Sequence, residues 1–172
     1  MLITLLSLFA CKSCHDNQII NQDKIQEDSG LGNAFDNDWG SWLAMDLLSD
    51  GTTAIAYYDK TDGGIGYATE VDSEWIHEPV DGYKDDQGLD QGDRGKYIDM
   101  VVASGDVVWL SYYDINLKNL RYATYDPSTS EWTNGLADSG GGSSPDAGLF
   151  TSIALDSSQN PVIAHYDQYK GE

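Results

Sequence analysis

The 172 residues include 29 acidic and 9 basic residues, which gives a formal net charge of −20 at pH 7. A surface of this charge repels nucleic acid and anionic lipid headgroups, so the sequence argues against nucleic acid as a partner. Hydrophobic residues make up 40% of the chain, enough for a folded core, and 18 glycines with 11 tyrosines favour turns and strands over helices.

The first ten residues, MLITLLSLFA, form an uncharged apolar run that is too short to span a bilayer as a helix. We interpret 1–10 as a signal peptide. A small residue, Ala10, precedes Cys11, and this pattern resembles the lipobox of bacterial lipoproteins. The resemblance implies cleavage before Cys11, lipid attachment to Cys11, and an exported protein anchored to a bacterial membrane, at the outer membrane or cell surface. An ordinary signal peptide with incidental cysteines is the alternative.

The segment 11–38 is rich in Asn, Gln and Asp and poor in large apolar residues, which predicts a flexible acidic tether. Cys11 and Cys14 are spaced as in redox and zinc motifs, and His15 follows them. A zinc site would need a fourth ligand, and a thioredoxin-like site would need a strand and a helix around the cysteines. We therefore expect no metal and no cofactor here.

From residue 39 onward the sequence repeats itself. The segments WLAMDLLSDGTTAIAYYD, YIDMVVASGDVVWLSYYD and FTSIALDSSQNPVIAHYD align without gaps and end at Asp59, Asp114 and Asp167, which are 55 and 53 residues apart. Such periods are typical of stacked repeat architectures. We divide the chain into repeats at 39–95, 96–148 and 149–172, of which the third is partial.

Each full repeat is expected to hold four short antiparallel strands, at about 42–48, 53–58, 65–70 and 75–80 in the first, because Gly- and Asp-rich turns separate β-rich runs. The second strand of each repeat is apolar on both faces, which predicts burial on both sides. A small residue recurs in it, as Ala56, Ser111 and Ala164, and would let a neighbouring sheet approach closely.

Four-stranded units of about 50 residues, buried on both faces, are what the blades of a β-propeller require. The pattern from Ser152 to Asp167, SIALDSSQNPVIAHYD, resembles the repeats of bacterial sialidase-like and related β-propeller proteins. The resemblance implies an all-β fold of propeller blades and leaves activity open. Two and a half blades make an incomplete ring, which leaves three explanations: a fragment of a longer protein, self-assembly of copies to close the ring, or a small open stack of sheets.

Three groups of residues are candidate sites. Asp59, Asp114 and Asp167 are expected to hydrogen-bond the backbone amides of the turns that follow them, rather than to line a site. His165 stands where the other repeats have tyrosine and is expected in the core. The loop 81–95 carries Asp85, Asp86, Asp90 and Asp93, which could supply oxygen ligands to calcium, although a solvated acidic loop is the simpler interpretation.

No catalytic constellation emerges. Sialidases hold a substrate carboxylate with three arginines, and this chain has only Arg94 and Arg121, of which Arg121 lies within a repeated strand and is expected to be structural. We therefore expect a non-catalytic, surface-exposed binding propeller with an unidentified protein or glycan ligand. The alternative is a sialidase-like glycan-processing enzyme whose catalytic residues lie partly outside this chain.

Overall fold

The computed structural model describes residues 38–84, 87–89, 91–143 and 145–171, which form ten β-strands and no helix. The first four strands are β1 (Trp39–Leu47), β2 (Thr53–Asp59), β3 (Gly64–Val71) and β4 (Glu74–Asp81). The next four are β5 (Arg94–Ala103), β6 (Val107–Asp114), β7 (Asn119–Asp126) and β8 (Glu131–Asp138). The last two are β9 (Ala147–Leu155) and β10 (Pro161–Asp167). Within these ranges there is accordingly nothing that could cross a membrane as a helix.

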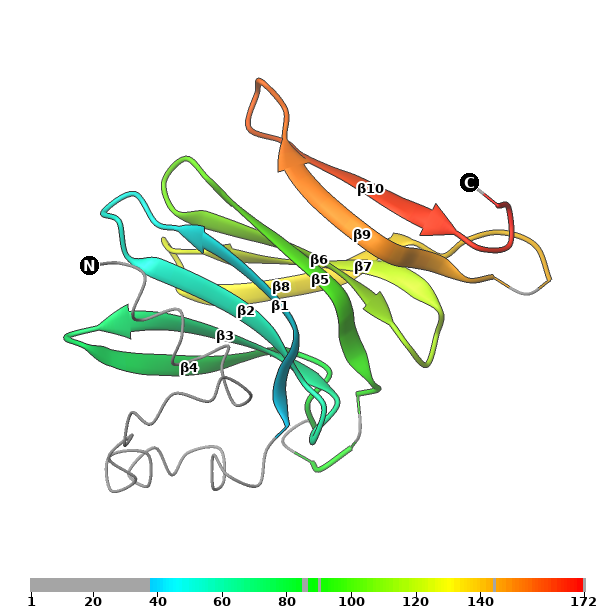
Figure 1. The fold of residues 1–172 in the computed structure, drawn as a ribbon, viewed down its shortest axis with the longest axis horizontal. Coiled ribbons are helices and arrows are strands. Elements are labelled where there is room, and N and C mark those ends of the chain that lie inside the picture. Colours follow the sequence, from blue (N-terminus) through cyan, green and yellow to red (C-terminus); the bar gives the residue numbers. More distant parts are fainter. Residues whose placement is uncertain (1–37, 85–86, 90, 144, 172) are drawn as a thin grey trace, which may run out of the picture.

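The strands form three sheets in which every hydrogen-bonded pair is antiparallel and consecutive in sequence. We call the four-stranded sheet β1–β4 unit 1, the four-stranded sheet β5–β8 unit 2, and the hairpin β9–β10 unit 3. Figure 1 shows the three units beside one another, with unit 2 between the other two. The prediction of an all-β fold is confirmed, and the four strands expected in the first repeat are present, with the first beginning at Trp39 rather than at residue 42.

Tight turns between the second and third strands depend on the repeated aspartates. Asp59 Oδ1 accepts hydrogen bonds from the backbone N–H groups of Thr61 and Asp62, at 2.9 and 3.2 Å. Asp114 binds the two equivalent amides at 3.0 and 2.8 Å, and Asp167 binds them at 3.0 and 3.1 Å. The structural interpretation of these three residues is therefore confirmed: each carboxylate satisfies turn amides that the sheet leaves without partners.

A second repeated motif opens each unit, and the sequence analysis missed it. It reads Asp-x-Gly and starts at Asp38, Asp93 and Asp146, with the same spacing as the aspartates that end the second strands. The glycines have φ of +85°, +120° and +102°, a region that disfavours side chains. At Gly148 a Cβ atom would lie 2.8 Å from the Cα atom of Leu120 in unit 2, so this glycine also permits a close approach of neighbouring units.

The core lies between the units. Its buried cluster combines residues from all four strands of unit 1, such as Ala56 and Ile65, with residues of unit 2, such as Ile98 and Leu110. Ala56 and Ser111 are fully buried, as their size predicts for close contact between sheets. Ser111 also accepts a hydrogen bond from the Thr151 hydroxyl of unit 3, at 2.8 Å between oxygens.

Burial of the second strand on both faces is confirmed for β2 and β6 and is wrong for β10. Nearly every residue of β2 is buried, whereas β10 alternates and exposes Val162, Ala164 and Tyr166. The reason is that β10 pairs only with β9, and no described segment covers its outer face. The apolar pattern of β10 thus creates an exposed face where the equivalent faces of β2 and β6 are covered.

Candidate functional site

Both arginines of the chain converge on one carboxylate between units 1 and 2. Arg94 Nη1 donates to Asp81 Oδ1 at 2.6 Å, and Arg121 Nε donates to Asp81 Oδ2 at 3.2 Å. Arg94 Nε also donates to Asp114 Oδ2, at 3.0 Å. Asp81 ends β4, Arg94 begins β5, and Arg121 lies on β7, so the cluster joins the edge of unit 1 to the middle of unit 2.

The arginine cluster is buried and closed to ligands. The side chains of Asp81 and Asp114 are 5% and 1% exposed, and those of both arginines less than 15%. The hydroxyl of Tyr112 donates to Asp81 Oδ2 at 2.5 Å, and burial followed by the charge of Asp81 raises the pKa of Tyr112 well above its usual value. Two positive and two negative side chains neutralise one another, so neither arginine is available to hold a substrate carboxylate. The structural role expected for Arg121 is confirmed.

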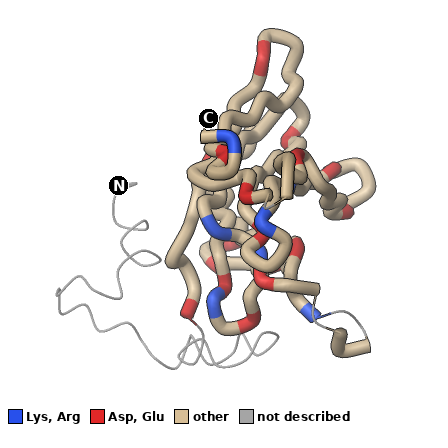
Figure 2. The backbone as a smooth tube through the Cα atoms, turned by 90° about the vertical axis from the view of Figure 1, so that its right-hand side faces the viewer, with Lys and Arg blue, Asp and Glu red and all other residues tan. Residues whose placement is uncertain are grey.

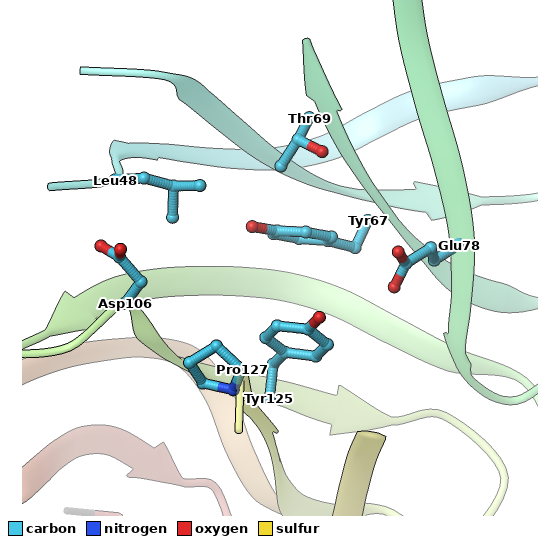
Figure 3. Close-up of a pocket in the computed structure, with 7 residues that line it drawn as sticks. All are labelled: Leu48, Tyr67, Thr69, Glu78, Asp106, Tyr125 and Pro127. Carbon is cyan, nitrogen blue, oxygen red and sulfur yellow. The ribbon is translucent and has the colours of Figure 1, made fainter. Parts of the chain in front are cut away.

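A pocket of about 250 Å³ opens at the junction of the same two units, and none of the residues of the arginine cluster lines it (Figure 3). Leu48, Tyr125 and Pro127 provide apolar surface, and Tyr67, Thr69, Glu78 and Asp106 provide oxygen atoms. The lining comes from β3 and β4 of unit 1, from β7 of unit 2, and from the β1–β2, β5–β6 and β7–β8 turns. We call it the inter-unit pocket.

Two aromatic rings that line the inter-unit pocket, those of Tyr67 and Tyr125, pack against a third ring, that of Trp132. Tyr67 and Tyr125 are stacked, with ring centroids 6.4 Å apart, and Trp132 meets both rings at 5.1 and 5.3 Å. The indole N–H of Trp132 donates to Glu78 Oε2 at 3.2 Å, which holds this carboxylate at the pocket. Asp106 is also fixed at the pocket, because its two carboxylate oxygens accept hydrogen bonds from the backbone N–H and the hydroxyl of Ser49, each at 2.7 Å.

The electrostatics of the inter-unit pocket favour neutral or cationic ligands. Burial raises the pKa of Tyr67 above its usual value, and the negative charges of Glu78 and Asp106 raise it further, so its hydroxyl stays protonated. The surface beyond the pocket is also acidic: Figure 2 shows Asp and Glu distributed along the described chain. Because no basic side chain lines the pocket, an anionic ligand would meet repulsion without a countercharge.

His165 was expected in the core, and the structure places it only partly buried there, with 17% of its side chain exposed. Its Nδ1 accepts a hydrogen bond from the backbone N–H of Gly148 at 3.1 Å, and its Nε2 lies 3.5 Å from Asp138 Oδ2. Asp138 ends β8 as Asp81 ends β4, so His165 meets the preceding unit at the position where Tyr112 does. Both ring nitrogens of His165 thus lie beside groups of units 2 and 3, as a structural role requires.

The acidic loop 81–95 is described only in part. Asp85, Asp86 and Asp90 lie outside the described residues, whereas Asp93 accepts a 2.7 Å hydrogen bond from the hydroxyl of Tyr58. Where side chains are described, no three acidic, histidine or cysteine residues are grouped as a metal ion would require. The segments predicted as a signal peptide (1–10) and as a tether (up to residue 37), together with Cys11, also lie outside the described part of the chain.

Comparison with protein-family models and with curated proteins found no match for this chain. The arginine cluster and the inter-unit pocket are therefore the two features from which a function can be inferred. The pocket could have been located in part from the sequence, since Tyr67, Thr69 and Trp132 fall on repeated positions. Glu78 and Tyr125 do not, and only the packing of the units brings them together.

Proposed function

We propose that this protein is a non-catalytic binding module built from β-propeller-type blades, exported and anchored to a bacterial membrane through lipid on Cys11. The observation that carries the non-catalytic role is the closed arginine cluster, since both arginines of the chain are bound to Asp81. Propeller architecture is supported by the antiparallel order of each four-stranded sheet, and by the packing of the first strand β5 against both β1 and β9.

The inter-unit pocket fits a neutral glycan as the ligand. Sugar rings combine apolar C–H faces with hydroxyl donors, and the pocket pairs apolar walls from Leu48, Tyr125 and Pro127 with acceptors on Glu78 and Asp106. A sialic acid, in contrast, would bring a carboxylate next to two carboxylates. The proposed ligand class is therefore uncharged oligosaccharide rather than sialylated glycan.

A glycan array probed with the labelled full chain tests this binding role, followed by calorimetric titration of the best ligand. Glu78→Gln and Tyr125→Ala should each weaken binding at least tenfold, because each removes a group that lines the pocket. Glu131→Gln is the matched control, since this exposed glutamate lies on β8 outside the pocket. Binding that is unchanged in both pocket variants would exclude the pocket, and the absence of any glycan ligand would exclude the proposed class.

The alternative function, glycan processing, is tested with a panel of fluorogenic glycosides that includes a sialoside. We expect no turnover above a blank reaction. Turnover that Asp81→Asn or Arg94→Gln abolishes without unfolding the protein would show that the arginine cluster opens to substrate, and the non-catalytic role would then be wrong.

The lipid anchor is tested by expressing the full chain in a bacterial host with metabolic labelling by a fatty acid. We expect label on the wild-type chain, recovery in the membrane fraction, and loss of both in Cys11→Ser, while Cys14→Ser retains both. Equal behaviour of the two variants would leave an ordinary signal peptide as the interpretation of 1–10.

A further inference from the structure

Units 1 and 2 meet in the same way as units 2 and 3. On one side of each junction a second strand presents a row of residues that the next unit covers: Ala54, Ala56 and Tyr58 on β2, and Trp109, Ser111 and Tyr113 on β6. On the other side the first strand of the next unit presents a largely apolar row, in which the first two residues are buried and the third is partly buried: Ile98, Met100 and Val102 on β5, and Thr151, Ile153 and Leu155 on β9.

Equivalent hydrogen bonds cross both junctions. Tyr58 donates to Asp93, and Tyr113 donates to Asp146, each at 2.7 Å between oxygens. Behind them the backbone N–H of Arg94 donates to the carbonyl of Gly63 at 2.9 Å, and that of Ala147 donates to the carbonyl of Lys118 at 3.1 Å. The Asp-x-Gly motif of each following unit thus receives a tyrosine hydroxyl and offers a backbone N–H to the preceding unit.

An aromatic ladder also runs through the junctions. Trp42, Tyr97 and Phe150 occupy the same repeat position, and their ring centroids are 4.5 Å apart between units 1 and 2 and 4.7 Å apart between units 2 and 3. The ladder is open at unit 3, where Phe150 is 68% exposed.

The second-strand surface of the junction occurs once more on unit 3, and the first-strand surface occurs once more on unit 1, and in both places it is exposed. On unit 3 the row Val162, Ala164 and Tyr166 is exposed, and the Tyr166 hydroxyl meets no partner among the described residues. On unit 1 the row Leu43, Met45 and Leu47 is 43–48% exposed, although the equivalent residues of β5 and β9 are wholly or largely covered. Gly40 leads into this row and keeps the positive φ of the other Asp-x-Gly glycines. We call these two surfaces the tail face and the head face.

We propose that the head face of a second copy of this chain docks on the tail face of the first. Tyr166 would then donate to Asp38 of the second copy, Gly171 would offer its carbonyl to the N–H of Trp39, and Phe150 would extend the ladder to Trp42. The partner is fixed by the chemistry of the two internal junctions, which already join tail-type to head-type rows within one chain.

The geometry of this contact determines its symmetry. Because the head and tail faces are different surfaces, the contact is heterologous, and repetition gives either a closed ring or an open chain of copies. One hydrogen bond of the internal junctions could not form between copies. Ser49 donates to the side chain of Asp106 in the next unit, and Ser104 donates to that of Gln159. The residue of unit 1 that corresponds to these two acceptors is Gly51, which has no side chain. The copy–copy contact should therefore be weaker than the internal junctions. The charge of −20 on each copy opposes it, so association should strengthen as salt rises.

Sedimentation velocity tests the proposal on the full chain, produced without export so that Cys11 carries no lipid, and kept reduced. We expect species larger than the 18.8 kDa monomer, increasing with protein concentration and with salt. Met45→Lys on the head face and Val162→Lys on the tail face should each weaken association at least tenfold. The matched controls are Ile76→Lys and Leu136→Lys, since both residues are about as exposed but lie on the outer strands β4 and β8.

Mixing the two variants gives the sharper test. Met45→Lys keeps an intact tail face and Val162→Lys keeps an intact head face, so an equimolar mixture should form dimers and nothing larger, while each variant alone stays monomeric. A wild-type chain that is monomeric up to about 100 µM in 0.5 M salt would overturn the proposal. So would controls that dissociate as readily as the face variants, or a mixture that stays monomeric.

Discussion

Asp81→Asn is expected to destabilise the fold far more than the same change at the equivalent position, Asp138. The Asp81 side chain is 5% exposed, and its two oxygens bind Arg94, Arg121 and Tyr112 at 2.6, 3.2 and 2.5 Å. Removing one charge from a buried, hydrogen-bonded cluster costs about 3–5 kcal/mol. The Asp138 side chain is 38% exposed, and its Oδ2 lies 3.5 Å from His165 Nε2. Asp138→Asn should therefore lower the free energy of unfolding by about 1 kcal/mol or less.

Urea unfolding followed by far-UV circular dichroism measures the difference. With a denaturant slope of about 2 kcal/mol per molar, a loss of about 4 kcal/mol moves the midpoint of Asp81→Asn down by about 2 M. The double variant Asp81→Asn/Arg121→Gln restores a neutral cluster and should lose less than the two single variants together. If Asp81→Asn and Asp138→Asn unfold at midpoints within about 0.5 M of each other, the arginine cluster does not stabilise the junction of units 1 and 2 as argued.

Three further outcomes are expected. In the same urea assay, Gly148→Ala should lower the free energy of unfolding by about 1–3 kcal/mol more than Gly40→Ala does. Both glycines have positive φ, but only at Gly148 does the added Cβ meet the backbone of Leu120. Equal losses would contradict the close approach of units 2 and 3. Thr151→Val should cost about 1–3 kcal/mol, because it leaves the buried Ser111 hydroxyl without its partner, and a cost near zero would mean that this bond adds nothing. Five tyrosines have raised pKa values, mainly through burial: Tyr58, Tyr67, Tyr83, Tyr112 and Tyr113. The unfolded chain ionises its tyrosines near pH 10, whereas the folded chain keeps these five protonated to higher pH. Their contribution to the free energy of unfolding is therefore intact below pH 10 and falls as the pH rises above it. Absorbance at 295 nm should therefore show these tyrosines ionising only together with unfolding, whereas ionisation of all eleven near pH 10 in a folded protein would refute their burial.

Local features of the fold were readable from the sequence. The strand pattern of the repeats predicted the antiparallel order of units 1 and 2, because short apolar runs separated by Gly and Asp turns have few other solutions. The roles of Asp59, Asp114 and Asp167 were also predicted correctly, since a carboxylate and the amides two and three residues later are joined by the turn itself. The Asp-x-Gly motif was equally visible, at the same offsets as the repeats, and was overlooked.

Contacts between units could not be predicted in this way. The apolar pattern of β10 matches those of β2 and β6, yet β10 is exposed, because burial depends on whether a neighbouring sheet is present and not on the strand alone. The pairing of both arginines with Asp81, and the meeting of Leu48, Glu78 and Tyr125 at the inter-unit pocket, join residues 13 to 77 positions apart. The sequence by itself determined the repeated unit, since hydrogen bonds within a meander are local. Only the tertiary structure decided which carboxylates are neutralised, which aromatic rings meet and which faces stay open, because these depend on how one unit packs against the next.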